Sequence, residues 1–565
     1  MLSTPSNCGA GPEMVPLRLG LALSGGGFRA ASFHLGVLKR LEELGLLHRV
    51  EALSTVSGGS IVGALFALRC AERGGTPGSY SIDELIGEMR PFLTENLRAK
   101  ALFGSPWRAV RAAASILLPY VSRVGLLVEE LDRQLFHGHT LNELPPWIAI
   151  NATNLRTGKG WRFLHDRAGD YLAGATEYTK SIRIAEAVAA SAAYPGVADS
   201  YSFHTRWEAL RGDILSEGRW ERPPESSVRR VSRWRERYGK LTGKVKFPLV
   251  DGGLYDNEGV NALRGHRVTH AIISAVAPPE TDTEHGFGPC RLLRIIEVMH
   301  NRLGAATRQL AHEMTHGVDP GEAATRLNKL ASELRHASQD ENVPADVRTV
   351  LARGVEEAAA LATVGSPPRG PQFRASAQIL LHRDDLAENA FAAPGKGGHD
   401  VPSRYRALDS ALVAELSRVR TDLDALEPRI VDLLIAQGYF LADFLVKLTM
   451  PEIVFREGTG VRWYDAGVSP EWKCAHAAVE SAVAERTAVL AEMRAASTRV
   501  LPIGRVRSQR LGMIAHLNLA LVLAPAATVS VLICGYVGYD LWRGLSAIIA
   551  FVMRYLAPVH PLGNT

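Results

Sequence analysis

A strand that runs directly into three glycines and then into a helix constrains the fold of this chain more than any other feature. The apolar run Leu17–Leu23 predicts a short buried strand with Arg18 at its exposed start. Gly25–Gly27 follow, and residues 30–41 have the pattern of a helix. The first N–H groups of a helix lack partners within it and lie at the positive end of the helix dipole. We therefore expect an α/β unit whose glycine turn binds an oxyanion or a phosphate.

A second strand ends at a serine. Residues 50–56 predict a strand, Ser57 follows at the turn, and another helix begins after it. A strand–serine–helix turn is the nucleophile elbow, which normally has the pattern Gly-x-Ser-x-Gly. Here the pattern is Thr55–Gly59, so a β-branched residue replaces the first glycine. Ser54 lies inside the strand and Ser60 inside the helix, so we predict that Ser57 is the nucleophile.

A serine hydroxyl is a weak nucleophile without an adjacent base. The chain has 18 histidines, but none lies in a loop motif after a strand, where α/β hydrolases place theirs. Asp251 does follow an apolar strand and precedes Gly252 and Gly253. We predict that Asp251 takes the proton of Ser57 and returns it to the leaving alcohol. The alternative is that Asp251 only forms an Asx turn.

The order of these motifs, together with Ala-Ala-Tyr-Pro-Gly at 192–196, resembles the patatin-like phospholipase family. The resemblance implies an α/β fold with three α/β/α layers, a mostly parallel sheet and helical insertions. It implies a serine ester hydrolase of the phospholipase A or lysophospholipase type, acting on membrane phospholipid or another acyl-ester lipid without a cofactor. An inactive family member that only binds lipid or a partner protein is the alternative.

Each candidate residue has an expected role. We expect Ser57 and Asp251 to be catalytic, and the glycines to form the oxyanion hole: Gly25, Gly26, Gly27 and Gly58. Supporting roles are expected for Arg29, Gly59, Gly252 and Gly253, and no metal is expected in this site. Arg29 stands where the family has a basic residue; otherwise it is a surface charge at the start of a helix.

The length of 565 residues suggests a core with additions. We expect a catalytic core at 17–285, a helical extension at 286–450, a helical stalk at 451–510 and a hydrophobic membrane-anchoring region at 511–556. Five scattered cysteines suit a reducing compartment. The net charge of +5 gives no reason to expect a nucleic-acid partner. The oligomeric state stays open.

Two segments outside the core motifs have more than one interpretation. The insertion at about 205–246 is rich in Arg and Trp, which suits an anionic lipid surface, or it is a solvated surface segment. His312-Glu313-x-x-His316 matches the zinc-protease pattern. A zinc site needs a third protein ligand, for which Glu333 is a distant candidate, and we prefer an exposed helix face.

The C-terminal region indicates a membrane. Residues 517–539 contain no charged side chain, a length typical of a transmembrane helix, although a pair of buried helices is the alternative. Arg505, Arg507 and Arg510 precede this run and favour a cytoplasmic side for the catalytic domain. We therefore expect a C-terminal transmembrane segment that anchors the protein in a bacterial inner membrane, with the catalytic domain facing the cytoplasm.

Overall fold

The computed structural model describes residues 17–117, 123–194, 199–210, 243–263, 268–276, 375–381, 410–419, 423–454 and 472–498, with the single positions 332, 335, 339 and 408. Several expectations fall outside these residues. They are Pro195-Gly196, most of the Arg/Trp-rich insertion, the His312–His316 motif, most of the extension at 286–450 and the whole region 511–556.

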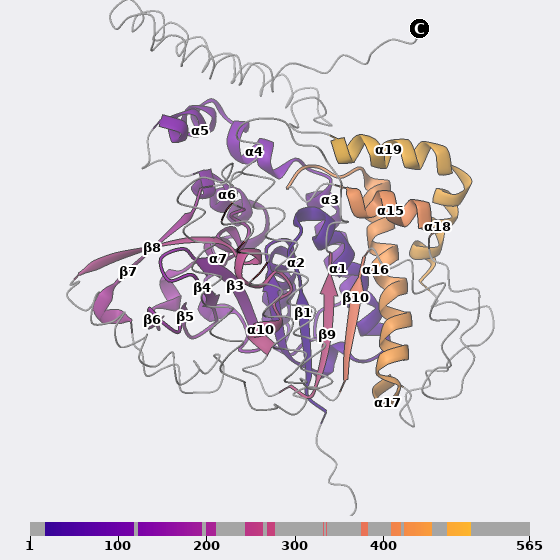
Figure 1. Cartoon of the computed structure of the whole chain (residues 1–565), viewed down its shortest axis with the longest axis horizontal. Coiled ribbons are helices and arrows are strands. Elements are labelled where there is room, and N and C mark those ends of the chain that lie inside the picture. Colours follow the sequence, from indigo (N-terminus) through magenta and orange to yellow (C-terminus); the bar gives the residue numbers. More distant parts are fainter. Residues whose placement is uncertain are drawn as a thin grey trace, which may run out of the picture.

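The described strands form one ten-stranded sheet (Figure 1). Its main order is β10-β9-β1-β2-β3-β4-β5-β6, while β8 pairs with β3 and β7 pairs with β8. The strands are β1 (Leu19–Leu23), β2 (Val50–Val56), β3 (Ile148–Asn154), β4 (Lys159–Phe163), β5 (Ala168–Asp170), β6 (Gly174–Thr176), β7 (Tyr201–Arg206), β8 (Lys244–Asp251), β9 (His270–Ala275) and β10 (Ala375–Leu380).

The central part of the sheet is parallel. β10, β9, β1, β2 and β3 pair in parallel, whereas β4 to β8 are joined by antiparallel pairs. Every residue of β1 and β9 is buried, as expected for parallel strands covered on both faces. The predicted α/β class with a mostly parallel central sheet is thus confirmed.

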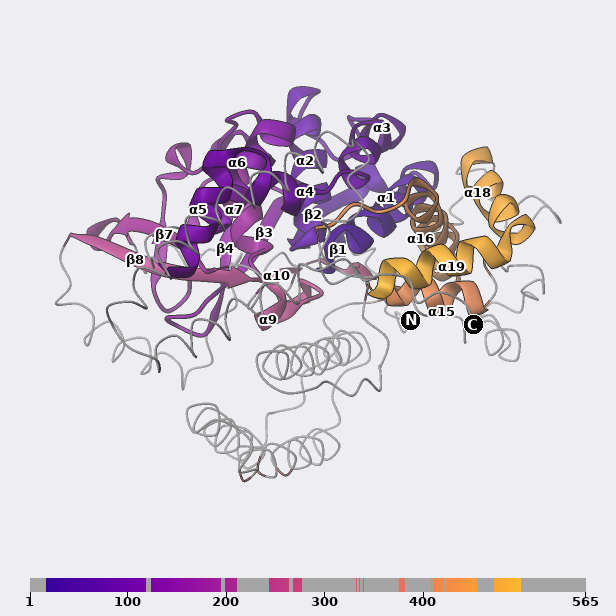
Figure 2. The same ribbon diagram turned by 90° about the horizontal axis from the view of Figure 1, so that it is seen from above.

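Helices cover both faces of the sheet. They are α1 (Gly27–Glu43), α2 (Gly58–Glu72), α3 (Ile82–Leu93), α4 (Leu97–Phe103), α5 (Pro106–Leu117), α6 (Arg123–Leu131), α7 (Ile184–Ser191), α9 (Gly253–Asp256), α10 (Val260–Leu263), α15 (Ser410–Arg418), α16 (Pro428–Thr449), α17 (Pro451–Val454), α18 (Lys473–Ala484) and α19 (Arg486–Thr498). In Figure 2, α1, α2 and α3 lie on one side of the sheet and α9 and α10 on the other. Short 3-10 turns occur at Leu47–Arg49, Leu141–Glu143, Thr179–Ser181 and Trp207–Ala209, and a π turn at Asp132–Phe136.

The larger core lies on the α1 side, where α16 packs along α1. Two glycines allow this approach: a Cβ at Gly36 would lie 1.8 Å from the carbonyl oxygen of Ile435, and one at Gly438 would lie 2.1 Å from that of Phe33. Within the expected helical extension at 286–450, the apolar segment 433–439 is part of α16. A smaller apolar cluster lies under α10 on the opposite face.

Residues 472–498 differ from the exposed stalk that their sequence suggested. They form α18 and α19, which pack on α16 and α15. The reason is an apolar stripe along the two helices, in which four side chains are buried: Ala475, Ala482, Val489 and Met493. In the part of the chain that the structure describes, no helix has the length and apolar character to cross a membrane.

Candidate active site

The register of the sheet brings the predicted nucleophile and base together. β2 runs parallel to β3 and ends at Val56, which lies opposite Asn151. β8 runs antiparallel to β3 and ends at Asp251, which lies opposite Ala152. Because these partners are adjacent in β3, Ser57 and Asp251 arrive at the same place from opposite directions. The Ser57 side chain is close enough to the Asp251 carboxylate to lower its pKa through a side-chain interaction.

Ser57 has the backbone of a nucleophile elbow. Its φ of 51° and ψ of −117° lie in a region that non-glycine residues rarely adopt. Helix α2 begins at the next residue, so the serine lies between the end of a strand and the N-terminus of a helix. Its side chain is buried in this structure, with 7% of the residue exposed.

Ser191, at the end of α7, braces the elbow. Its hydroxyl accepts a hydrogen bond from the backbone N–H of Ser57 at 2.8 Å and donates to the carbonyl of Asn151 at 2.6 Å. It also lies 2.9 Å from the hydroxyl of Ser60. The N–H of Ser57 is therefore occupied, and Ser60 is a bracing residue and not a second exposed nucleophile.

The threonine that replaces the first glycine of the motif fits through two compensations. The Thr55 hydroxyl donates to the carbonyl of Ala149 at 3.2 Å and accepts from the Ser60 hydroxyl at 3.1 Å. The branched methyl group of Thr55 occupies space above Gly63, where a Cβ would lie only 2.4 Å from it. This contact between strand and helix therefore still requires a glycine, but that glycine is Gly63 in the helix and not the residue at position 55 in the strand.

The N-termini of α1 and α2 meet beside Ser57. Gly26 and Gly27 have φ values of 137° and 57°, which only glycine adopts without strain. A Cβ at Gly58 would lie 2.1 Å from the carbonyl oxygen of Gly27, so the two helix starts are in direct contact. Among the described residues, the N–H groups of Gly26, Gly27 and Gly58 have no hydrogen-bond acceptor.

Gly25 departs from its expected role in the oxyanion hole. Its N–H already donates to the carbonyl of Asn257 at 3.0 Å, so it is not a free donor. Its importance is steric, because a Cβ there would lie 2.5 Å from the Asn257 side-chain oxygen. Gly59 is also a packing position, since its Cβ would lie 2.4 Å from the carbonyl oxygen of Leu23.

Asp251 is held mainly by backbone groups. Its N–H donates to the carbonyl of Ala193 at 2.9 Å, and its carboxylate accepts from the N–H of Gly253 at 2.7 Å. The latter bond is the Asx turn considered above, but the carboxylate contacts Ser57 as well. Burial raises the pKa of Asp251 to about 6, against the lowering effect of these two interactions. Gly252 fits closely, since a Cβ there would lie 2.4 Å from the Asn151 carbonyl oxygen.

Arg29 is buried and is not a surface charge. Its hydrogen bonds go to the backbone near the end of α15 and not to Asp251. It is 1% exposed and donates to the carbonyls of Ser417 and Val419, the latter at 2.9 Å. These carbonyls lie at the end of α15, so the arginine joins α1 to that helix. Burial lowers the pKa of Arg29 to about 10.

Sequence reasoning missed Ser191 and Asn257 as parts of this site. Ser191 ends an alanine-rich helix, and nothing in that pattern distinguishes its hydroxyl. The carboxylate of Asp256, next to Asn257, caps the N–H groups of Gly259 and Asn261. The structure's described residues contain no group of three or more side chains that could hold a metal ion.

Solved structures similar to this chain include human GIVD cytosolic phospholipase A2. The free protein has 14% identity and a TM-score of 0.35, over 86% of this chain and 60% of that one. Its complex with methyl γ-linolenyl fluorophosphonate has 14% identity and a TM-score of 0.33, over 85% and 59%. A complex that also contains terbium chloride has 16% identity and a TM-score of 0.28, over 46% and 40%. This chain thus spans at most about 60% of the length of those structures.

The comparison with family models gives a clearer result than the comparison with solved structures. No curated protein sequence matches the chain. Residues 21–264, however, match the family model described as patatin-like phospholipase. This segment contains the glycine turn, the elbow and Asp251. The chain is therefore similar to the patatin-like phospholipase family over residues 21–264.

Proposed function

We propose that this protein is a lipid acyl hydrolase of the phospholipase A or lysophospholipase type, with Ser57 and Asp251 as its catalytic dyad. The observation that carries the proposal is the placement of Ser57 beside the buried Asp251 carboxylate, where β2 and β8 end opposite adjacent residues of β3, next to two helix N-termini. The match of residues 21–264 to the patatin-like phospholipase model supports a carboxylic ester of a lipid as the substrate.

In the first step, Asp251 takes the proton of Ser57 as its oxygen attacks the ester carbonyl. Negative charge then develops on the carbonyl oxygen. The N–H groups of Gly26, Gly27 and Gly58 are the candidate donors to this oxyanion, because the N–H groups of Gly25 and Ser57 are occupied. Asp251 next gives its proton to the leaving alcohol, which departs and leaves an acyl group on Ser57.

The second step returns the enzyme to its starting state. Water replaces the alcohol, and Asp251 takes a proton from it as its oxygen attacks the acyl-serine carbonyl. Collapse of this intermediate releases the fatty acid, and the proton on Asp251 returns to the Ser57 oxygen. With its pKa raised to about 6, Asp251 is mostly ionised at pH 7, yet is a stronger base than an ordinary carboxylate.

Labelling with a fluorophosphonate tests this dyad. Wild-type protein should be labelled once and should hydrolyse a soluble ester, while Ser57→Ala should lose both activities. Asp251→Asn should lower kcat by about 10³-fold or more. Ser202→Ala on β7 and Asp256→Asn serve as controls, and turnover per labelled site should be retained in both.

The alternatives predict different results. An inactive scaffold would show no Ser57-dependent hydrolysis, and its biological effect would survive Ser57→Ala. A histidine variant that loses about 10³-fold in activity with its fold intact would replace the dyad by a triad. Metal analysis of the purified protein tests the zinc-protease alternative, whose motif at His312–His316 lies outside the described residues.

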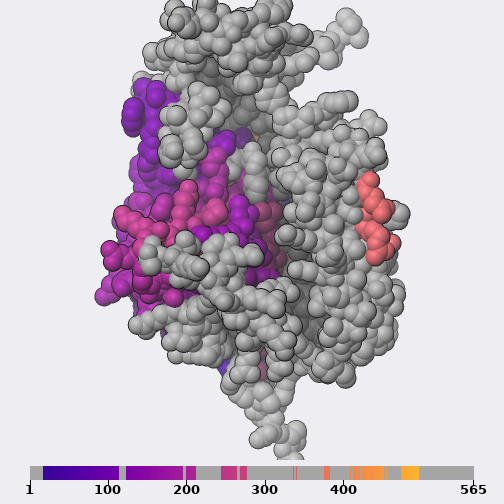
Figure 3. Space-filling view, turned by 60° about the vertical axis from the view of Figure 1, so that its left-hand side comes forward, coloured from indigo at the N-terminus to yellow at the C-terminus, as the bar shows by residue number. Residues whose placement is uncertain are grey.

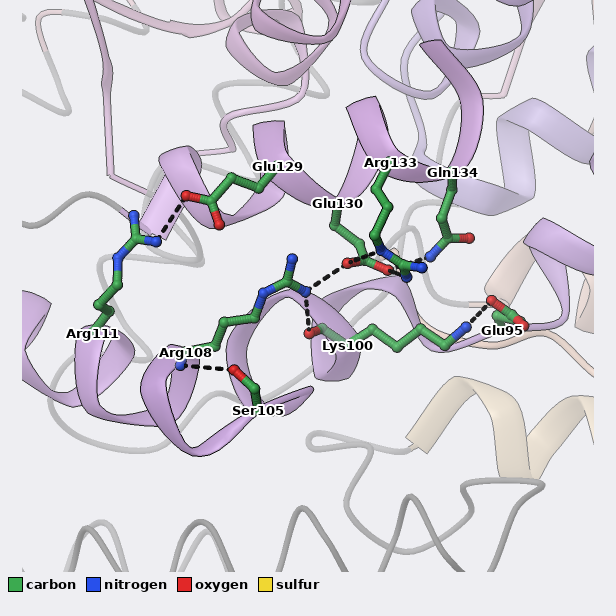
Figure 4. Close-up of polar contacts among 9 residues, drawn as sticks. All are labelled: Glu95, Lys100, Ser105, Arg108, Arg111, Glu129, Glu130, Arg133 and Gln134. Carbon is green, nitrogen blue, oxygen red and sulfur yellow. Dashed lines mark hydrogen bonds and ion pairs between the residues drawn. The ribbon is translucent and has the colours of Figure 1, made fainter. Parts of the chain in front are cut away.

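We also propose that α5 contacts the lipid surface that contains the substrate. Trp107 and Val110 are 68% and 45% exposed on this helix. The opposite side of α5 buries Ala109 and Ala112, and Arg108–Glu130 at 2.6 Å and Arg111–Glu129 at 2.7 Å bind the helix to α6 (Figure 4).

With the helix held in this way, Trp107 and Val110 face outward, and tryptophan favours the level of lipid headgroups. α4 and α5 lie beyond the end of the sheet toward which β9 points (Figure 1). Figure 3 shows this side of the molecule, with the violet helical region above the magenta strands. Replacing Trp107 by Ser should reduce binding to phosphatidylcholine–phosphatidylglycerol vesicles and leave soluble-ester turnover unchanged. Equal vesicle binding by both proteins would refute the contact.

Membrane anchoring by residues 517–539 remains our proposal for the C-terminal region, supported by their lack of charge and the arginines before them. The same observations support the proposal of a cytoplasm-facing catalytic domain. A chain shortened after Arg510 should become soluble and keep its activity on a soluble ester. It should lose much of its activity on bilayer lipid, because tethering raises the local substrate concentration. Extraction of the full chain by carbonate without detergent would contradict a transmembrane segment.

A further inference from the structure

One buried histidine lies directly behind the glycine turn. His34 is two helical turns into α1 and fully buried. Its Nε2 lies 2.9 Å from the carbonyl oxygen of Ser24, and its Nδ1 lies 2.7 Å from the hydroxyl of Ser274. The imidazole thus connects α1 with the residue after β1 and with the C-terminal part of β9.

These partners determine where the ring carries its proton. A carbonyl oxygen only accepts hydrogen bonds, so Nε2 must carry the hydrogen that points at Ser24. In the neutral ring, Nδ1 then accepts a hydrogen bond from the Ser274 hydroxyl. Burial lowers the pKa of His34 to about 4, so the ring is neutral at neutral pH. Both nitrogen atoms are occupied, which leaves neither to act as a base on Ser57.

Ser24 is the residue that joins β1 to the glycine turn, and every polar group that it has is bonded. Its N–H donates to the carbonyl of Ser274 at 3.0 Å, and its hydroxyl accepts from the N–H of Val276 at 3.0 Å. Its carbonyl accepts from His34. A Cβ at Gly59 would lie 2.7 Å from that same carbonyl oxygen, so the first turn of α2 packs against it.

We propose that His34 is a positioning residue, which fixes the Ser24 carbonyl and thereby aims the N–H groups of Gly26 and Gly27 at the developing oxyanion. This inference rests on the function proposed above. Gly26 and Gly27 have no side chains with which to anchor themselves, and glycine is the most permissive residue in backbone conformation. An oxyanion hole works only if its donors are oriented before the reaction begins. The bond from His34 supplies one fixed end for this turn.

Two amide variants separate the two bonds of the imidazole. In His34→Gln, the side-chain amide reaches about as far as Nε2 and donates to the Ser24 carbonyl. In His34→Asn, the amide is one carbon shorter and reaches only about as far as Nδ1, on the Ser274 side. Both variants introduce the same polar group at the same buried position. His204→Gln on the exposed part of β7 is the control for a histidine remote from the turn.

The readout is kcat per site titrated with a fluorophosphonate, together with KM on a soluble ester. We expect His34→Asn to lower kcat by about 10²-fold, the scale of one misplaced oxyanion donor, with KM changed less than about threefold. Affinity for a trifluoromethyl ketone, which forms a tetrahedral oxyanion with Ser57, should fall with kcat. His34→Gln should retain most of both, and His204→Gln all of both.

The results distinguish failure of this inference from failure of the proposed function. If wild-type protein has no Ser57-dependent hydrolysis, the proposed function fails and the positioning role fails with it. If the wild type is active but the Gln and Asn variants have equal kcat per titrated site, only the positioning role is refuted. If neither amide variant folds, Ser274→Ala decides: it should lower kcat several-fold at constant KM, and an unchanged kcat overturns the proposal.

Discussion

The two members of the proposed dyad are held in different ways. Ser57 stands on a turn with positive φ, which is braced by hydroxyl groups from α7, α2 and β2 and by glycines that allow two helix starts to touch. Asp251 ends an ordinary strand, where pairing with β3 and the backbone groups of Ala193 and Gly253 hold it. The nucleophile therefore depends on side-chain identity, whereas the base depends on the course of the backbone.

This contrast predicts where substitutions should matter. Changes around the elbow should alter the placement of Ser57 even when they do not touch the substrate. Changes around Asp251 should act mostly through its carboxylate, because the pairing with β3 and the N–H bond to Ala193 do not involve its side chain. The following experiments test each side of the comparison.

Replacing Gly58 by Ala should have the largest effect. The new Cβ would lie 2.1 Å from the carbonyl oxygen of Gly27, a backbone atom that cannot move without displacing the glycine turn. We expect soluble-ester kcat to fall by about 10³-fold or more, because both the elbow and the oxyanion donors shift. Gly87→Ala in α3 is the matched control, since its Cβ would meet open space. Normal turnover in Gly58→Ala would contradict the contact between the two helix starts.

The second largest effect should come from low pH, which protonates Asp251 and so lowers activity. Only ionised Asp251 can take the proton of Ser57, and its pKa is raised to about 6. We expect kcat/KM to fall as pH decreases through about 6, to roughly one hundredth of its plateau near pH 4. A pH–rate profile on a soluble ester measures this. A profile whose acid limb has a midpoint near the ordinary 3.8 would contradict the raised pKa.

The contribution of Asp251 to the stability of the fold should increase as pH decreases, whereas activity decreases. Because burial raises the pKa of Asp251 above its unfolded value of 3.8, the folded state binds the proton more tightly. The contribution of this group to stability is complete below pH 3.8 and is lost as pH rises through about 6. Asp251→Asn should therefore be more stable than wild type at pH 7, by up to about 3 kcal/mol. Chemical denaturation at pH 7 and pH 5 checks both the sign and the pH window.

Ser191→Ala should have a moderate effect on the elbow side. It leaves the N–H of Ser57 without its acceptor, at a cost of about 1–3 kcal/mol for a buried donor. Some of this cost appears as a displaced Ser57, so we expect kcat to fall about tenfold while KM changes little. Ser202→Ala is the control at a serine without a role in the elbow. An unchanged kcat would show that the turn holds its shape without this brace.

The smallest effect concerns the fit between Thr55 and Gly63. Gly63→Ala should destabilise the wild type by about 1–3 kcal/mol, because its Cβ would lie 2.4 Å from the Thr55 methyl carbon. Thr55→Ser removes that methyl group and keeps the hydroxyl, so in this background Gly63→Ala should be neutral or stabilising. A double-mutant cycle of denaturation free energies measures the coupling. Additive effects would mean that the two residues do not share this space.

The local parts of the fold and site could be predicted from the sequence. The strand, glycine turn and helix at 19–43, and the strand–serine–helix turn at 50–72, are contiguous segments with clear patterns. Asp251 was also recognisable, because an acidic residue at the end of an apolar strand is a local signal. Its meeting with Ser57 depends on the register of β3, which no local pattern contains.

Contacts between distant segments account for what was missed. Arg29 looked like a helix-end charge, but its partners are Ser417 and Val419, nearly 400 positions away. The N–H of Gly25 looked free because its acceptor belongs to Asn257. Residues 472–498 looked like a stalk because two of the four buried side chains in the apolar stripe of α18 and α19 are alanines, a weak hydrophobic signal.

The close contact of α1 with α16 has a consequence for folding during synthesis on the ribosome. Gly36 lies against Ile435, and Gly438 lies against Phe33, about 400 residues away in the chain. At roughly 5–20 residues per second, a ribosome completes α16 on the order of 20–80 seconds after α1. During that interval the apolar face of α1 has no cover from its eventual neighbour, and the nascent chain is exposed to aggregation. A chain stopped at residue 264, the end of the family match, would never supply that cover.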